Sequence, residues 1–188
     1  MMNSLIQHIL FKMKTEELVN DEDEDVYRFG LECVLLKMIH YLSYILIGFV
    51  LHMTVPMLVS VMILMGLKSK TGGYHAKTRP GCYFFSCFVI FLICLLNKVM
   101  FPEWFFVLAV FFANIVVYCL VPIEHENRAL EQSERREFKK QALLLLGIVD
   151  AVIMATAVMD CVISRWLLNG ILVAAILILL GKCKRIIV

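Results

Sequence analysis

A histidine and a cysteine stand in one short polar stretch of an otherwise hydrophobic chain. His75 and Cys82 are the two residue types that form a thiolate nucleophile and its general base. On a continuous helix, their separation of seven residues corresponds to a rise of about 10.5 Å, which is too far for a hydrogen bond between the side chains. A catalytic dyad therefore requires the backbone to bend between them.

The residues around the pair are ones that interrupt helices. Pro80 lacks a backbone donor and disfavours helix at Arg79. Glycine permits conformations that are barred to other residues, and the stretch contains Gly72, Gly73 and Gly81. A fold-back that brings the histidine to the cysteine is therefore one hypothesis. The alternative is a basic loop whose glycines form a turn and whose histidine and cysteine are incidental.

Cys82 has the most polar surroundings of the seven cysteines. Positive charge favours a thiolate over a thiol, and Lys77 and Arg79 supply it close to Cys82. Cys183 is the nearest rival because it stands between two lysines, but no histidine is close to it in the sequence. The remaining cysteines, which form no CxxC pair, are Cys33, Cys87, Cys94, Cys119 and Cys161.

The whole chain has the composition of a membrane protein. Of its 188 residues, 61% are hydrophobic and the mean hydropathy is +0.84, far above the roughly half-apolar composition of soluble domains. A bilayer core of about 30 Å needs about 20 apolar residues per helix. The sequence therefore predicts an all-α, polytopic integral membrane protein with about six hydrophobic helical segments, within residues 31–50, 38–67, 80–97, 104–123, 141–159 and 166–181.

The second of these runs leaves the number of segments open. Residues 38–67 carry no Asp, Glu, Lys or Arg and are too long for one helix but short for two. Met53, Thr54 and Pro56 predict a turn that would leave a short second segment. No part of the chain is long and polar enough to be a separate soluble domain, so residues 1–188 are predicted to be a single membrane domain.

The net charge of +2 hides a strong asymmetry along the chain. With six spans and a cytosolic N-terminus, fifteen of the 18 Lys and Arg residues fall in cytosolic segments. Only Lys98 and Arg165 fall outside, and Lys37 lies near the cytosolic end of the first segment. The positive-inside rule predicts that both termini and the His75 to Cys82 stretch lie on the cytosolic side of the cell membrane. Nucleic acid is not needed to explain these charges.

Three segments are polar enough to lie outside the membrane core. Residues 1–30 begin with a pattern that predicts an amphipathic helix lying on membrane lipid, with the apolar residues Leu5, Ile6, Ile9, Leu10, Met13 and Leu18. The acidic run at residues 21–25 is interpreted as a solvated break between helices. Residues 68–82 form the stretch described above, and residues 124–140 form a basic cytosolic loop that could itself be a short helix.

The polar stretch belongs to a longer pattern. It contains the run Gly-Gly-Tyr-His-Ala at residues 72–76, the spacing of His75 and Cys82, and Ser86 four residues later. Residues 27–32 lie at the start of the first hydrophobic segment, Pro122 lies at the end of the fourth, and residues 127–128 and 137–140 follow it. In these features the chain resembles the accessory gene regulator protein B family, the membrane cysteine endopeptidases that process quorum-sensing propeptides.

The resemblance implies a cysteine endopeptidase without a cofactor, in which Cys82 is the nucleophile and His75 the base. The implied substrate is a short, membrane-bound propeptide with an amphipathic N-terminal helix and an acidic C-terminal tail. Cys82 would cleave the bond before the tail to give an acyl-enzyme thioester. A substrate Cys or Ser would then close a thiolactone or lactone ring, whereas water would give a linear product. The resemblance also implies a homodimer.

Other residues carry over from the resemblance in supporting roles. Lys68 stands seven residues before His75, where the family often has arginine, and keeps the charge without the bidentate fork. Glu32 falls near a family position that can be glutamine. Gly73 and Ser86 match, although a serine here can also satisfy its own helix backbone. The residues that could attract the acidic tail, which positive-inside anchoring explains equally well, are Arg135, Arg136, Lys139 and Lys140.

Asp150 is the one acid in the middle of a predicted span. A carboxylate there is costly and suggests a function, either orienting His75 or pairing with Lys37; the alternative is a span that is shifted or lines water. A metal site of His75, Cys82 and Cys87 lacks a recognised spacing and a fourth ligand, so no metal is predicted. The rival to a peptidase is a non-catalytic transporter subunit or sensor whose basic loop binds a partner.

Overall fold

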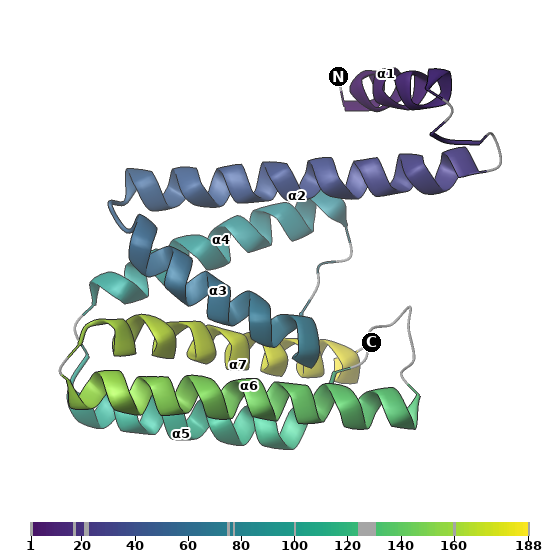
Figure 1. The fold of residues 1–188 in the computed structure, drawn as a ribbon. Coiled ribbons are helices and arrows are strands. Elements are labelled where there is room, and N and C mark those ends of the chain that lie inside the picture. Colours follow the sequence, from purple (N-terminus) through teal and green to yellow (C-terminus); the bar gives the residue numbers. More distant parts are fainter. Residues whose placement is uncertain are drawn as a thin grey trace. The chain divides into compact units, whose positions relative to one another are not determined.

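The computed structural model describes residues 2–16, 18–20, 23–74, 76, 78–99, 101–123, 131–159 and 161–187. Within these ranges the regular structure is helical and contains no strand. The chain divides into two compact units, Met1–Leu46 and Ile47–Val188. The helices are α1 Met2–Thr15, α2 Glu24–Val50, α3 Thr54–Thr71, α4 Arg79–Lys98, α5 Glu103–Leu120, α6 Gln132–Val158 and α7 Ile163–Ile187 (Figure 1). The predicted all-α fold class is confirmed.

The first unit contains the predicted N-terminal helix. In α1, Ile6 and Leu10 lie one turn apart and are each only 2% exposed, whereas Phe11 is 72% exposed. Lys14 forms an ion pair of 2.6 Å with Glu24. Glu24 and its neighbour Asp25 lie in the first turn of α2, where negative charge is favourable at the positive end of the helix dipole. The acidic run is therefore not wholly a break between helices, because its last two residues start α2.

The charge-free run at residues 38–67 forms parts of two helices. α2 ends at Val50 and α3 begins at Thr54, and between them His52 has a φ of 55°. The two helices are joined by a short turn, in which the Met53 N–H donates to the Gly48 carbonyl at 2.8 Å. The predicted turn at residues 53–56 is confirmed to within a few residues.

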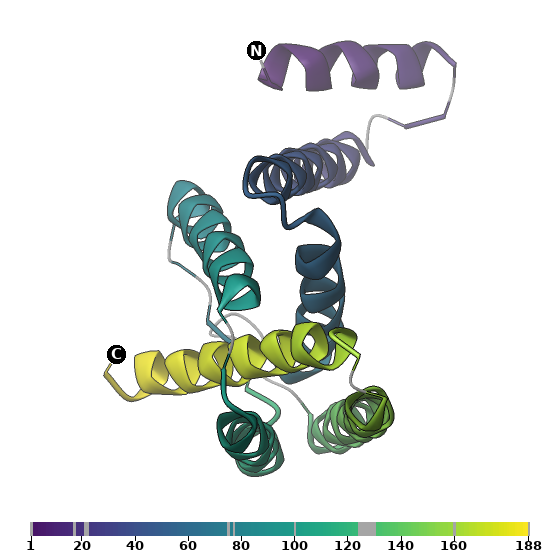
Figure 2. The same cartoon turned by 90° about the vertical axis from the view of Figure 1, so that its left-hand side faces the viewer.

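In the second unit, α7 is the central helix. It contacts α3, α4, α5 and α6, and both views show α3 and α4 on one side of it and α5 and α6 on the other (Figures 1 and 2). A buried polar network joins three of these helices at one end. The Ser60 hydroxyl donates to the Trp166 carbonyl at 2.7 Å, and the Asn97 amide donates to the Ser60 hydroxyl at 3.1 Å. Asn169 donates to the Asn97 oxygen at 2.9 Å, so neighbouring helices satisfy buried polar groups that lipid could not.

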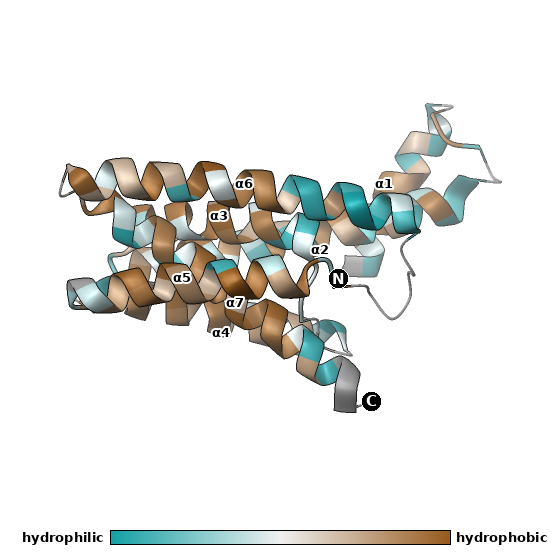
Figure 3. Cartoon of the chain, turned by 90° about the horizontal axis from the view of Figure 1, so that it is seen from below, coloured by the Kyte–Doolittle hydropathy of each residue, from teal (hydrophilic) through white to brown (hydrophobic). Residues whose placement is uncertain are grey.

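Four of the helices are long and apolar enough to cross a membrane: α2, α4, α6 and α7. α5 is a shorter apolar helix over Trp104–Leu120. The six predicted hydrophobic segments fall on α2 to α7, with the run at residues 38–67 divided between α2 and α3. Figure 3 shows that α6 is hydrophilic over its first turns and hydrophobic along the rest of its length. The chain is a membrane protein.

The helix boundaries correct two of the sequence predictions. α4 begins at Arg79, one residue before Pro80, because a proline is tolerated in the first turn of a helix, where its missing N–H has no partner to lose. Residues 132–140, predicted as loop or short helix, are the first turns of α6. There Glu131 and Glu134 form a reciprocal capping box, which satisfies backbone donors at the start of a helix.

Candidate active site

The segment between α3 and α4 is held by backbone hydrogen bonds to two other parts of the second unit. The Ile123 N–H donates to the Thr71 carbonyl at 2.9 Å, and the Tyr74 N–H donates to the Leu177 carbonyl at 3.0 Å. Gly72 closes α3 by donating its N–H to the Lys68 carbonyl at 3.1 Å. The predicted interruption between two helices is confirmed. Hydrogen bonds join the first residues of this segment to α7 and to the segment after α5.

Both glycines of the segment adopt backbone conformations that favour glycine. The φ of Gly72 is 72° and that of Gly73 is 131°, a region that other residues rarely occupy. A Cβ on Gly72 would collide with the carbonyl oxygen of Ile123. On the other side, a Cβ on Gly181 of α7 would lie 2.8 Å from the carbonyl carbon of Gly73 and 2.9 Å from the nitrogen of Tyr74. Glycines on both elements therefore allow the segment to lie directly on α7.

Cys82 lies in the first turn of α4 and is half-buried. Thr78 is the N-cap of this helix, and its hydroxyl accepts from the Gly81 N–H at 3.2 Å. The Cys82 N–H donates to the Thr78 carbonyl at 2.9 Å. The sulfur is therefore carried by a capped helix N-terminus, whose partial positive charge favours a neighbouring anion.

Lys68 lies in the last turn of α3, outside the four candidate spans. Burial lowers the pKa of the Lys68 ammonium, and the charge of Cys82 acts in the opposite direction. The two groups therefore interact electrostatically across the segment, although fourteen residues separate them in the sequence. Ser86 is half-buried on α4, one turn after Cys82.

The residues on either side of position 75 contact the start of α4. The Tyr74 ring lies 4.7 Å from the Phe85 ring, measured between centroids, and the Lys184 ammonium lies 5.8 Å from the centre of the Tyr74 ring. The Ala76 methyl lies beside Gly81, 3.5 Å from the position of a Cβ there. The predicted base His75 and the predicted charge of Lys77 lie outside the described residues, as do residues 124–130 of the predicted basic loop.

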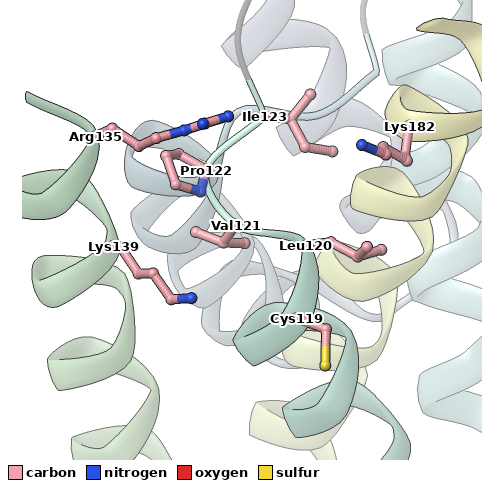
Figure 4. Close-up of a pocket in the computed structure, with 8 residues that line it drawn as sticks. All are labelled: Cys119, Leu120, Val121, Pro122, Ile123, Arg135, Lys139 and Lys182. Carbon is pink, nitrogen blue, oxygen red and sulfur yellow. The ribbon is translucent and has the colours of Figure 1, made fainter. Parts of the chain in front are cut away.

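The basic residues of α6 separate into two pairs. Arg135 and Lys139 line a cavity of about 330 Å³ together with Lys182 of α7 and the end of α5 (Figure 4). Arg136 and Lys140 are exposed and are not among the described lining residues of this cavity. Lys182 was not singled out from the sequence because only the packing of α7 brings it to α6. A helix-end lysine is its only local signal.

Asp150 lies in a groove between α5 and α6, in a cavity of about 340 Å³. Asn114 of α5 lines the same cavity, and its amide donates to the Val110 carbonyl at 3.0 Å. The Asp150 Oδ1 atom is buried and has no hydrogen-bond partner among the described residues. Asn114 was missed at the sequence level because one uncharged polar residue in an apolar helix is a weak signal. The suggested links to His75 and Lys37 stay predictions.

Glu32 lies in the first unit, on α2, and is half-buried. Its supporting role stays a prediction. Among the described residues, no group of three His, Cys, Asp or Glu side chains is placed to hold a metal ion.

Comparison with known proteins identifies the family. The family model described as Accessory gene regulator B matches residues 5–181. The chain belongs to the accessory gene regulator B family. It is also 21% identical over 159 residues to the Putative AgrB-like protein 2 of Clostridium perfringens (strain 13 / Type A), covering 79% of this chain and 73% of that protein. No solved structure matches the chain.

Membership of the accessory gene regulator B family gives the chain a role in the processing of quorum-sensing peptides. The match covers both units, from α1 to the last turns of α7. The resemblance seen in residues 27–32, 72–86 and 122–140 therefore extends over nearly the whole chain.

Proposed function

We propose that this chain is a membrane-embedded cysteine endopeptidase in which Cys82 is the nucleophile and His75 the general base. The observation that supports this best is the position of Cys82 in the first turn of α4, directly after the cap made by Thr78, with Lys68 of α3 within electrostatic range. The contacts of Tyr74 and Ala76 with the first turns of α4 hold the residues before and after position 75 close to the helix that carries Cys82. A partly accessible cysteine in positively charged surroundings is typical of reactive thiols.

The proposed reaction has two acyl-transfer steps. The Cys82 thiolate attacks the carbonyl carbon of the bond before the tail, and His75 in its protonated form gives a proton to the departing amine. This step breaks the C–N bond, forms a thioester on Cys82 and releases the tail. A Cys or Ser side chain of the substrate, deprotonated by His75, then attacks the thioester, closes the ring and releases Cys82. Attack by water at the second step gives the linear product.

The proposed substrate is a short amphipathic propeptide with an acidic C-terminal tail. Arg136 and Lys140 lie one turn apart on the exposed surface of α6 and present two positive charges to such a tail. Arg135 and Lys139 point elsewhere, into the cavity with Lys182. We assign the initial attraction of the tail to Arg136 and Lys140, the pair outside the cavity, because a long-range charge effect needs no fixed geometry.

The supporting residues take roles that fit their contacts. Lys68 supplies a positive charge that interacts with Cys82, and Gly73 lets the segment before His75 lie on α7. Ser86, Glu32 and Asp150 are proposed as supporting residues that do not themselves react with the substrate. The homodimer is also part of the proposal. The basic end of the second unit, formed by the last turns of α3 and α7 and the first turns of α4 and α6, is proposed to face the cytosol because positive charge concentrates there.

The test is propeptide processing in membranes that contain wild type, Cys82→Ala, His75→Ala or Cys183→Ala. Cys183 is exposed near the end of α7 and controls for the loss of an accessible thiol. We expect tail release and the hydroxylamine-sensitive acyl-enzyme to disappear in the first two variants and to persist in Cys183→Ala. Processing by a folded Cys82→Ala variant would exclude the proposed nucleophile.

A further inference from the structure

We propose that the cavity at the basic end of α5, α6 and α7 binds the headgroup of an anionic phospholipid. One acyl chain of this lipid lies in the adjoining groove between α5 and α6. The site is separate from the proposed dyad and does not depend on it.

The headgroup part of the site is formed by three cationic side chains. Arg135 and Lys139 lie one turn apart on α6, and Lys182 reaches the same cavity of about 330 Å³ from α7 (Figure 4). None of the described lining residues is acidic. Arginine binds phosphate through two parallel hydrogen bonds, and lysine adds a compact charge. Basic pockets between membrane helices are suited to anionic headgroups.

The dipoles of the helix ends beside the cavity do not determine the sign of its electrostatic potential. The first turns of α6 contribute about half a positive charge, and the last turn of α5 contributes about half a negative charge. These partial charges oppose each other, whereas the three side chains carry a full charge each. The cationic side chains therefore determine which ligand the cavity prefers.

The acyl-chain part of the site is the groove between α5 and α6. Cys119 lines both this groove and the basic cavity, so the two spaces adjoin. Phe111 and Ile115 lie one turn apart on its wall and are 65% and 47% exposed. Tyr118 belongs to the groove, and its ring lies 5.2 Å from the Lys139 ammonium of the cavity. An apolar surface is thus continuous with a cationic one.

This combination favours a lipid over an acidic peptide. The carboxylates of a peptide tail could use the three cations but would leave the apolar groove empty. A peptide backbone in that groove would place its N–H and C=O groups against hydrocarbon without partners, at a cost of several kcal/mol for each unsatisfied group. A phospholipid places a phosphate at the cations and a hydrocarbon chain on Phe111 and Ile115, so it uses both halves.

Occupancy of the site bears on the segment between α3 and α4. Ile123 lines the basic cavity, and its N–H holds the carbonyl of Thr71, the last residue of α3. A headgroup that bridges α6 and α7 would stabilise the packing around Ile123. We therefore expect an anionic lipid to support the geometry in which the segment before His75 lies on α7.

The experiment measures binding of phosphatidylglycerol and phosphatidylcholine to the full chain in detergent, by native mass spectrometry and by the shift in melting temperature. The test variant is Arg135→Gln/Lys139→Gln. The matched control is Arg136→Gln/Lys140→Gln, which removes the same charge from the same helix outside the cavity. With about fivefold in affinity for each cation near an anionic lipid, we expect the test variant to lose about thirtyfold in phosphatidylglycerol affinity and the control to retain it.

Cys119 provides a second measurement that does not depend on a variant. It is exposed and lies where the two spaces meet, so phosphatidylglycerol should slow its alkylation by N-ethylmaleimide while phosphatidylcholine and free glycerol phosphate should not. Equal loss of binding in both double variants, or unchanged Cys119 alkylation, overturns the proposal. Displacement of the bound lipid by a soluble acidic peptide would assign the cavity to the peptide instead.

Discussion

Replacement of Gly181 by alanine tests whether the loop before His75 is held directly on α7. A Cβ at this position would lie 2.8 Å from the Gly73 carbonyl carbon and 3.1 Å from its Cα. Both are backbone atoms, so neither moves without shifting the loop. Overpacking of this kind costs roughly 1–3 kcal/mol, and loss of the 3.0 Å hydrogen bond from Tyr74 to Leu177 costs about 1 kcal/mol more.

The structural effect of Gly181→Ala should be limited to the loop and the part of α7 that it contacts. Alanine stabilises a helix interior by roughly 0.5–1 kcal/mol relative to glycine, which offsets part of the strain, so the protein should still fold and insert. The displaced loop should slow tail release by roughly tenfold to a hundredfold, because each 1.36 kcal/mol of lost positioning corresponds to about tenfold in rate. The assays are propeptide cleavage in membranes at matched protein levels and the alkylation rate of Cys82.

The control for this prediction is Gly30→Ala. A Cβ on Gly30 meets nothing within 4 Å, so the same substitution in another helix should leave processing near the wild-type rate. If Gly181→Ala cleaves the propeptide as fast as wild type and Cys82 is alkylated at an unchanged rate, the close contact between Gly73 and α7 does not matter for the reaction.

Three other predictions follow from the described contacts. Thr78→Ala removes the hydroxyl that caps α4 and should destabilise the start of this helix by about 1 kcal/mol. Thr78→Ser should keep both the cap and processing. Equal thermal stability of the two variants would contradict this prediction. Lys68→Gln should slow alkylation of Cys82 at neutral pH, because it removes a charge that interacts with the thiolate. Lys68→Arg keeps the charge and should keep the alkylation rate. Equal rates in the glutamine and arginine variants would count against the interaction. A membrane-impermeant maleimide should reach two cysteines from opposite sides of the membrane: Cys183 near the end of α7 from the cytosol, and Cys161 in the turn before α7 from outside. Labelling of Cys183 from outside would reverse the proposed orientation.

The sequence predicted those features that depend on local chemistry. Glycines and a proline marked the interruption between α3 and α4, and the turn between α2 and α3 was visible in Thr54 and Pro56. Helical spacing of apolar residues identified α1. Thr78 could also have been found, because a threonine two residues before Pro80 has the pattern of a helix N-cap followed by an early proline. Each of these signals lies within a few residues of the feature that it predicts.

Features that depend on packing could not be predicted in this way. Arg135 and Lys182 line one cavity although 47 residues separate them. Neither local sequence predicts that the two residues are neighbours. Periodicity shows which face of a helix is apolar but not which helix covers it. Residues 132–140 were predicted as a loop or a separate short helix because they are highly charged. The capping box of Glu131 and Glu134 instead makes them the first turns of the long helix α6.

The two glycines before Tyr74 are explained by residues far from them in the sequence. Gly72 has no space for a Cβ because of Ile123, and Gly73 lies against Gly181. A chain that keeps the Gly-Gly-Tyr-His-Ala run but carries a larger residue at position 181 would therefore keep the motif and lose the geometry that the motif allows. Substitution of Gly181 thus separates two explanations of the glycines. If they act only through backbone freedom, Gly181→Ala should be harmless, whereas contact with α7 makes it as damaging as a change at Gly73.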